Sequence, residues 1–393
     1  MKLIQEIIAI APELEHWRQT IHTHPELAFE ETKTSELVAG ILSSHGIEVH
    51  RNIGGTGLVG IITAETDGPT IALRADMDAL PMQEQTTGLA YTSTISGQSH
   101  SCGHDGHTTM LLGAALYLAK NPPKSGKVVL IFQPAEETGE GAPRMIEDGL
   151  FERFPCDEIY GCHNMPLIDK GKAGMRVGPT LSSYVDLEID IVGKGGHAAA
   201  PHTVDDPLQV AARLVTELSS LVGRYVDPSQ TATVGIGLLQ AGTTNNVIPE
   251  TAHIAGTIRS LSVDYQNTLF ERITALCEGF SKAYSVQITP KFLNVGLPCI
   301  NAADQVSTIA EAASQVLGAD NVDTDIAPYS FADDFAYFQD KIPGAYYFLG
   351  QGGTMVHEPT YNFDDDLLPI GASIFAHVID AKLGLTHPIR YAK

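Results

Sequence analysis

The chain has 393 residues, and 43% of them are apolar, which is enough to fill the cores of two domains. Lysine and arginine number 24 against 47 aspartates and glutamates, and the resulting net charge of −23 would repel a phosphate backbone. The charge therefore disfavours binding to nucleic acid or to an anionic membrane surface. No run approaches about 18 consecutive apolar residues, so the sequence does not predict a membrane span.

The first segment, MKLIQEIIAIAPELEHW, predicts an amphipathic helix and not a signal peptide. Glu6 interrupts the apolar stretch, and the segment contains no small-residue cleavage site, so we expect a cytoplasmic protein. The cysteines are scattered and odd in number, which argues against a disulfide framework and favours a reducing compartment. They are Cys102, Cys156, Cys162, Cys277 and Cys299.

Short apolar strands alternate with helical segments in the first third of the chain. Strands are predicted at 58–62, 70–75, 128–132 and 158–164, and residues 105–120 have the apolar spacing of a helix. This alternation predicts an α/β fold, with a largely parallel sheet covered by helices on both faces.

The pattern changes near Gly178. From Tyr184 onward, in YVDLEIDIVG, apolar residues alternate with acidic ones, as in a strand with one face in water. A helix, two strands, a second helix and a last strand follow, and this β-α-β-β-α-β order is that of the ferredoxin-like unit. We therefore expect an inserted α+β lid domain at 180–293, and a larger domain formed by 1–179 and 294–393. A small inserted domain can hinge over a site on the larger one.

Cys102 and His104 lie two residues apart in SHSCGHDGHT (99–108). Both side chains can reach one point only if the backbone between them is not helical, so we expect them in a loop that the following helix anchors. A deprotonated cysteine and a neutral histidine bind Zn²⁺ or a similar divalent ion. The alternative is a buried free cysteine beside helix-capping polar residues, but the three histidines and the aspartate around Cys102 favour a metal site.

Glu136 and Glu137 directly follow a strand in QPAEETGEG (133–141), where Pro134 ends the strand. Sites on open parallel sheets lie at the carboxyl ends of the strands. Two adjacent carboxylates resist joint ionisation in water-poor surroundings unless a cation offsets one of them. An exposed acidic loop is the alternative reading in a chain this acidic.

Two further histidines complete the set of candidate ligands. His163 ends a predicted strand and His357 lies in a later loop, and each alone is more often a structural histidine. Cys102, His104, Glu137 and His163 all fall at one predicted sheet edge, so they can converge on one ion.

Several motifs occur in order along nearly the whole chain. They are HTHPELAFEETKT (22–34), RADMDALPM (74–82), SCGHDGHT (101–108), PAEETGEG (134–141), HNMP (163–166), GKGGHAAAPH (193–202), NNVIPE (245–250), GTIRS (256–260) and VHEP (356–359). Together they resemble the metallo-amidohydrolase family of hippurate hydrolases, N-acyl-amino-acid deacylases and auxin-conjugate hydrolases, in its Cys-containing subfamily. The ordered match is far more specific than any one motif.

The resemblance implies a zinc-exopeptidase-like catalytic domain with a mixed, largely parallel sheet. Glu136 matches the family's general base. The family's ligands to a pair of divalent ions match Cys102, His104, Glu137, His163 and His357.

Two aspartates are expected to orient these ligands. Members of the wider peptidase clan carry a histidine ligand where this chain has Asp76. The resemblance implies that Cys102 replaces that ligand here. Asp76 and Asp78 are then expected to orient the ligands and not to bind metal themselves. Thiolate and imidazole suit Zn²⁺, carboxylates also suit Mn²⁺, and Co²⁺ or Ni²⁺ stay open.

Three lid residues also match family motifs. The histidine of relatives that corresponds to His197 reaches the active site of a partner subunit, or the same site after closure, and donates to the oxyanion. Asn246 and Arg259 match groups that hold the substrate's carboxylate. From the residues alone, His197 reads as part of a polar turn and Arg259 as half of a surface ion pair. The resemblance further implies a homodimer, or a dimer-based oligomer, formed through the lid.

We therefore expect hydrolysis of the amide bond of a small N-acyl amino acid, such as an N-acetyl or N-benzoyl compound. Glu136 would take a proton from a water activated by the metal ions and return it to the departing amine. A dipeptidase or carboxypeptidase with the same metal centre is one alternative, and a catalytically silent metal- or ligand-binding protein is another. No motif decides which acyl group and which amino acid are used.

Overall fold

The computed structural model describes residues 1–85 and 88–392, which form two compact units. The larger unit consists of Met1–Thr180, Ile300–Ala327 and Asp333–Lys393. The lid unit consists of Leu181–Cys299 and also takes in Pro328–Ala332, a short piece of the later chain. Within the described ranges, the longest apolar helices fall short of what a membrane crossing requires.

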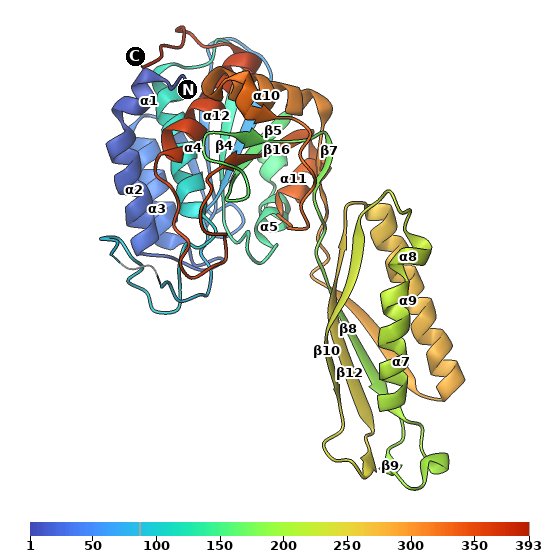
Figure 1. The fold of residues 1–393 in the computed structure, drawn as a ribbon. Helices are drawn as coiled ribbons and strands as arrows, with labels where there is room; N and C mark the ends of the chain where they lie inside the picture. The colour runs from blue at the N-terminus through green and yellow to red at the C-terminus, as the bar shows by residue number, and fades with distance from the viewer. Residues whose placement is uncertain (86–87, 393) are drawn as a thin grey trace. The chain divides into compact units, whose positions relative to one another are not determined.

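The larger unit is built on an eight-stranded mixed sheet with the order β1-β2-β4-β3-β5-β16-β6-β15 (Figure 1). The four strands β4, β3, β5 and β16 run parallel to one another, whereas β1 and β2 form an antiparallel edge. The strands are β1 (Glu48–Arg51), β2 (Leu58–Thr63), β3 (Thr70–Asp76), β4 (Lys127–Gln133), β5 (Glu158–Met165), β6 (Ala173–Gly174), β15 (Val322–Asp323) and β16 (Gly344–Gly350).

Helices cover both faces of this sheet, as the alternating pattern predicts. Successive residues of β16 point to opposite faces of the sheet. On one face, Tyr347 joins the core formed with α4, α10 and α12. On the opposite face, Tyr346 packs against Phe335 of α11. The helices are α1 (Gln5–Ala9), α2 (Ala11–Thr23), α3 (Thr32–Ser44), α4 (His104–Lys120), α5 (Gly141–Glu147), α6 (Leu150–Arg153), α10 (Ala303–Leu317), η2 (Ala319–Asn321), α11 (Phe335–Lys341) and α12 (Leu367–Leu383).

The lid unit is an antiparallel sheet with the order β10-β12-β8-β13, and α7 and α9 pack together against it (Figure 1). From Val185 to Ile191 of β8 the apolar residues are buried and the acidic residues between them are half-exposed, which confirms the alternation read from YVDLEIDIVG. Asp206 and Ser262 cap α7 and α9 through their side-chain oxygens. The main elements are β8 (Val185–Val192), α7 (Pro207–Ser220), β10 (Ala232–Ala241), β12 (Thr251–Ser260), α9 (Val263–Tyr284) and β13 (Gln287–Leu293).

Short elements complete the lid unit and its connections. A two-stranded ribbon of β9 and β11 extends the unit, and β7 pairs with β14 where the chain passes between the two units. Their bounds are β7 (Gly178–Leu181), β9 (Gly196–His197), η1 (Pro201–Thr203), α8 (Val222–Tyr225), β11 (Val247–Ile248) and β14 (Cys299–Asn301). The expected fold class, a mixed α/β unit with a ferredoxin-like insertion, is confirmed.

Candidate metal centre

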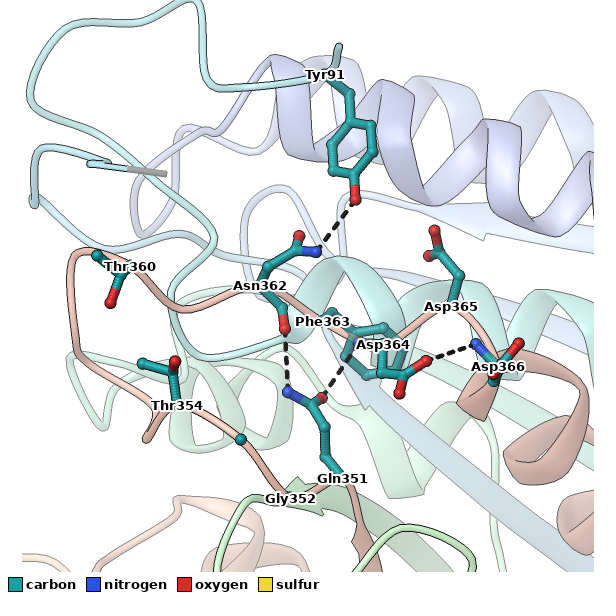
Figure 2. Close-up of a pocket in the computed structure, with 11 residues that line it drawn as sticks. Tyr91, Gln351, Gly352, Thr354, Thr360, Asn362, Phe363, Asp364, Asp365 and Asp366 are labelled. Carbon is teal, nitrogen blue, oxygen red and sulfur yellow. Dashed lines mark hydrogen bonds between the residues drawn. The ribbon is translucent and has the colours of Figure 1, made fainter. Parts of the chain in front are cut away.

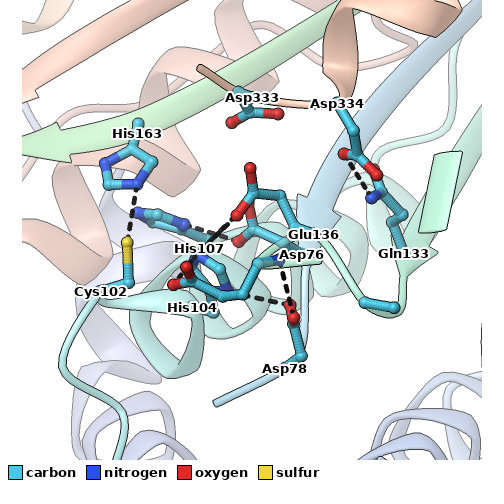
Figure 3. A network of polar contacts seen from close by, with 12 residues as sticks. Asp76, Asp78, Cys102, His104, His107, Gln133, Glu136, His163, Asp333 and Asp334 are labelled. Atoms are coloured by element: carbon cyan, nitrogen blue, oxygen red, sulfur yellow. Dashed lines mark hydrogen bonds and ion pairs between the residues drawn. The ribbon is translucent and has the colours of Figure 1, made fainter. Parts of the chain in front are cut away.

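The candidate ligands lie at one edge of the larger sheet, where the parallel strands β3, β4 and β5 end (Figure 3). Glu136 and Glu137 lie in the loop after β4, as expected. Two positions differ from the expectation. His104 is the first residue of α4 and not part of the preceding loop, and His163 lies within β5, two residues before its end.

Gly103 is what brings Cys102 and His104 to one place. It caps α4 in the left-handed conformation with φ of 98°, so the chain turns sharply between the two ligand candidates. A Cβ atom at this position would lie 2.4 Å from Oδ1 of Asn164. Only glycine therefore fits this turn.

The five candidate ligands converge. Sγ of Cys102 lies 3.4 Å from Nε2 of His163, and Oε2 of Glu137 lies 3.4 Å from Nε2 of His357. Nε2 of His104 lies 3.7 Å from Oε1 of Glu137. The candidates form two groups whose ligand atoms lie within 4.8 Å of one another and which share Cys102. The first is Cys102, His104 and His163, and the second is Cys102, Glu137 and His357.

The outer ring nitrogens of two histidines are engaged, so their Nε2 atoms face the centre. Nδ1 of His163 donates to the carbonyl of Asn164 at 2.6 Å, and Nδ1 of His104 lies 3.1 Å from Oδ1 of Asp78. Asp78 also accepts the backbone N–H of Glu137 at 2.9 Å. Asp78 thus contacts two of the candidate ligands, which is the arrangement expected for a group that orients them.

Within residues 1–85 and 88–392, Asp76 forms no hydrogen bond with a candidate ligand and contacts the residues behind the ligands. Its Oδ1 accepts from Nδ1 of His107 at 2.7 Å, and its Oδ2 accepts from Arg74 at 2.7 Å. Nε2 of His104 is 3.9 Å away, which is too far for a hydrogen bond. His107 in turn bonds Oδ1 of Asn164 at 2.7 Å.

The donor set fits a divalent cation. Nε2 of His104 and Oε1 of Glu137 are buried without a hydrogen-bond partner in the described part of the chain, and such orphaned polar atoms are costly. Burial, together with the charges of Glu137 and Glu136, holds the pKa of the Cys102 thiol well above its usual range. A cation bound between these atoms would remove both costs, since it accepts the lone pairs and favours the thiolate.

The pKa values of the two adjacent glutamates are shifted in opposite directions. Burial, followed by the charges of Asp333 and Glu137, holds the pKa of Glu136 well above its usual range. Burial also disfavours the charge on Glu137, but a hydrogen bond from His357 and the charge of His104 outweigh it and lower its pKa. The surroundings therefore favour the charge on Glu137 over a charge on Glu136, because two neighbouring carboxylates resist joint ionisation where no cation offsets one of them.

A buried arginine behind Glu136 escaped the reading of the sequence. The Arg74 guanidinium bonds Oε1 of Gln133 at 2.7 Å and contacts Asp333 and Asp334 at 3.1 and 3.2 Å. Asp334 also accepts from the Gln133 side chain at 2.7 Å and from the backbone N–H of Ala142 at 2.8 Å. The sequence signal for this group of Arg74, Gln133, Asp333 and Asp334 is the pair of adjacent aspartates in FADDFA. His107 had a clearer signal, since it lies three residues after His104 on the same helix.

A cavity of about 480 Å³ lies beside the segment that carries His357 (Figure 2). Its walls come from Tyr91 and from residues within 351–354 and 360–366, and none of the candidate ligands lines it. Asp365 in its wall forms a two-point ion pair with Arg18, and Gln351 links the cavity to Asn164 at 3.3 Å. This hydrogen bonding holds both ends of the segment that carries His357.

The lid candidates separate into two places within their own unit. His197 on β9 pairs with Val247 on β11, and the carbonyl of Asn246 accepts from the N–H of Ala198, so His197 and Asn246 are neighbours. Arg259 lies eight residues after Thr251, the first residue of β12, which is about 26 Å along that strand.

Each of these lid side chains keeps a donor available. Nδ1 of His197 accepts from the N–H of Ala199 at 3.0 Å, so the neutral ring carries its proton on Nε2. Thr244 donates to Oδ1 of Asn246 at 3.2 Å, which leaves the amide nitrogen. The Arg259 guanidinium stacks 4.4 Å from the centre of the Tyr184 ring, and in the described residues no carboxylate forms an ion pair with it.

Comparisons with known proteins agree with this geometry. The model of peptidase family M20/M25/M40 matches residues 72–381. Hippurate hydrolase of Campylobacter jejuni is 40% identical over 96% of this chain and 98% of its own length. N-acetyl-L-cysteine deacetylase of Bacillus subtilis is 38% identical over 92% of this chain and 85% of its own length.

A solved structure extends the likeness to three dimensions. The YXEP protein of Bacillus subtilis, a dinuclear metal-binding peptidase from family M20, has a TM-score of 0.84 and 32% identity. The likeness covers 96% of this chain and 99% of that one. The chain belongs to peptidase family M20/M25/M40 and is a metal-dependent hydrolase.

Proposed function

We propose that this hydrolase cleaves the amide bond of N-acyl amino acids and releases a carboxylic acid and a free amino acid. The observation that carries the proposal is the geometry of the two glutamates: Glu137 contacts His104 and His357, and Oε2 of Glu136 lies beside them, 3.8 Å from Nε2 of His104. A charged Glu137 suits a metal ligand, and a Glu136 that readily holds a proton suits proton transfer to a departing amine. Relatives with the names hippurate hydrolase and N-acetyl-L-cysteine deacetylase support this substrate class.

Five residues would hold the metal pair, namely Cys102, His104, Glu137, His163 and His357. Bound divalent ions supply Lewis acidity and lower the pKa of a water to near 7, compared with about 15.7 in bulk. The thiolate and imidazole donors of these five residues favour Zn²⁺, and the carboxylate of Glu137 also suits Mn²⁺.

Glu136 carries the proton in this proposal. In its ionised form, which a nearby divalent cation would favour, Glu136 takes a proton from the attacking water. It later donates that proton to the amide nitrogen, which leaves poorly without one. His197 donates from Nε2 to the oxygen that becomes negative. Asn246 and Arg259 bind the carboxylate of the substrate, and the planar guanidinium of Arg259 can do so with two hydrogen bonds.

We further propose that two copies of the chain assemble through the lid unit and share substrate binding. A molecule of dipeptide size spans about 7 Å, whereas Arg259 lies about 26 Å along β12 from its start near Asn246. One lid therefore cannot bring both residues to the same substrate. Strand β10 supports the assembly, because among the described residues it pairs only with β12 and it exposes Leu238 and Leu239.

The test is a panel of hydrolysis assays on chelated protein reloaded with Zn²⁺, Mn²⁺, Co²⁺ or Ni²⁺. Substrates are N-benzoyl and N-acetyl amino acids beside dipeptides with a free amino group, and the free amino acid released is quantified. Metal content is measured on the same samples, with Glu136→Gln protein as the blank for contaminating enzymes.

We expect release from the N-acyl compounds and little from the dipeptides. The reverse preference would replace the proposal with a dipeptidase that uses the same centre. Equal release by the Glu136→Gln blank would show that the activity does not belong to this site.

A further inference from the structure

The loop between β4 and α5, residues 134–140, carries both glutamates and is folded around Ala135. The carbonyl of Ala135 accepts from the N–H of Gly141 at 3.1 Å and from the hydroxyl of Thr138 at 3.2 Å. The two ends of the loop therefore meet at this one residue, which directly precedes Glu136. The orientation of its peptide determines where the Glu136 side chain leaves the backbone.

Ala135 has an unfavourable backbone conformation. Its φ is 53°, in the left-handed region, which is unfavourable for a residue with a Cβ atom. Such a conformation persists only where surrounding contacts impose it. Something outside the loop must therefore hold Ala135.

Glu31 provides that contact from a distant part of the chain. Its Oε1 accepts the backbone N–H of Ala135 at 2.8 Å, and its Oε2 accepts from the hydroxyl of Thr56. The Glu31 side chain is fully buried and comes directly before α3, whose first turn bonds its carbonyl through the N–H of Ser35. Both carboxylate oxygens are thus fixed, and the support that they offer is rigid.

A carboxylate is a costly choice for this position. Burial, partly offset by the hydrogen bond from Thr56, raises the pKa of Glu31 to about 7. An apolar side chain would fill the space without this cost. The carboxylate does what an apolar side chain cannot, because it accepts the Ala135 N–H.

We infer that Glu31 is a positioning residue for Glu136, which holds Ala135 in its left-handed conformation and so directs the Glu136 carboxylate. The inference rests on the proposed role of Glu136 as the general base. It also assigns a role to the HTHPELAFEETKT segment, which supplies none of the candidate ligands.

The experiment compares four variants of the full-length, metal-loaded protein. Glu31→Ala removes the acceptor, and we expect kcat to fall about tenfold to a hundredfold with metal content and KM little changed, since small misplacements of catalytic groups cost this much. Glu31→Gln keeps an oxygen for the Ala135 N–H and should stay within severalfold of wild type. The double variant Glu31→Ala/Ala135→Gly should regain most of the lost kcat, because glycine adopts positive φ without penalty.

Glu26→Ala is the matched control. Glu26 belongs to the same segment and accepts the N–H groups of Lys33 and Thr34 at 3.1 and 2.9 Å, so its loss loosens the start of α3 without touching Ala135. We expect normal kcat. A loss in Glu26→Ala equal to that in Glu31→Ala would overturn the inference in favour of a general structural role.

Hydrogen exchange of the amides of 135–141 gives a readout that does not depend on activity. With and without chelator, exchange should be faster in Glu31→Ala than in wild type and unchanged in Glu26→Ala. Unchanged exchange in Glu31→Ala, or a double variant no faster in turnover than Glu31→Ala alone, would overturn the inference. If wild type cleaves no N-acyl amino acid, the proposed function fails and the exchange result still decides what Glu31 does to the loop.

Discussion

At the scale of single residues, the centre works by giving neighbouring side chains different surroundings. Glu136 and Glu137 are adjacent in sequence, yet Glu136 faces the carboxylates of Asp333 and Asp334 while Glu137 contacts His357. Their contacts, and not their chemistry, separate the proposed proton carrier from the proposed metal ligand.

Substitution of each glutamate should separate the two roles. Glu136→Gln should retain metal and lose a factor of about 10²–10⁴ in kcat, because a general base is lost while the ligands stay. Glu137→Gln should lose metal, because an amide is a poorer ligand than a carboxylate. Elemental analysis and turnover on one preparation of each variant check both statements. Normal metal content in Glu137→Gln would contradict its assignment as a ligand.

His22 should make stability depend on pH. Burial lowers the pKa of this histidine, but its hydrogen bonds to Asp105 and Glu84 outweigh burial and raise the pKa from 6.5 to about 9. A raised pKa means that the folded state holds the proton more tightly, so this stabilisation is complete below pH 6.5 and disappears as the pH rises through about 9.

Urea unfolding of wild type and His22→Gln at about pH 6 and about pH 9.5 measures the effect. We expect the free energy of unfolding to fall less steeply with pH in the variant. His50→Gln is the control, because His50 pairs with Glu48 at the surface with 32% of its side chain exposed. A parallel fall in His22→Gln and wild type would contradict the prediction.

At the scale of elements, Arg74 joins parts of the fold that bear on the centre. It lies on β3 and contacts Gln133 at the end of β4 and the two aspartates at the start of α11. The edge of the sheet is therefore held by one buried charge shared among several carboxylates.

Arg74→Met should destabilise the fold by about 3–5 kcal/mol, since it leaves buried carboxylates without a partner. The free energy of unfolding from urea titration is the measurement. Arg144→Met removes the arginine of an exposed pair with Glu147 and should change stability little. Equal effects of the two substitutions would show that the buried cluster does not behave as a unit.

At the scale of the whole molecule, the proposed sharing of lid residues between two copies predicts complementation. Glu136→Gln and His197→Ala should each be nearly inactive as homodimers. After subunit exchange, a mixture of the two contains hybrid dimers with one subunit of each variant. The same pairing can be made with Arg259→Ala in place of His197→Ala. We expect one of the two mixtures to regain activity and the other not, because the two lid residues lie too far apart to serve one substrate.

Turnover of the mixtures, compared with that of the separate proteins, is the measurement. Recovery in both mixtures or in neither would contradict shared binding. Molecular mass from light scattering tests the assembly directly, and Leu239→Lys on the exposed face of β10 should lower it.

Local rules explain what could be read from the sequence. Alternation in β8, the strand that ends before Pro134 and the helix predicted at 105–120 depend on residues a few positions apart, and the structure contains all three. Placing His104 in a loop was wrong, because the turn at Gly103 is complete within one residue and α4 begins directly after it.

Long-range contacts and backbone strain could not be read in this way. Arg74 and Asp334 are 260 positions apart, and Glu31 and Ala135 are 104 apart. The sequence by itself determined the order of the elements and the residue types at one sheet edge, since both follow from short-range periodicity. Only the tertiary structure decided which glutamate has the raised pKa, which nitrogen faces the centre and which distant side chain contacts the glutamate loop, because burial and contact arise only when distant segments pack.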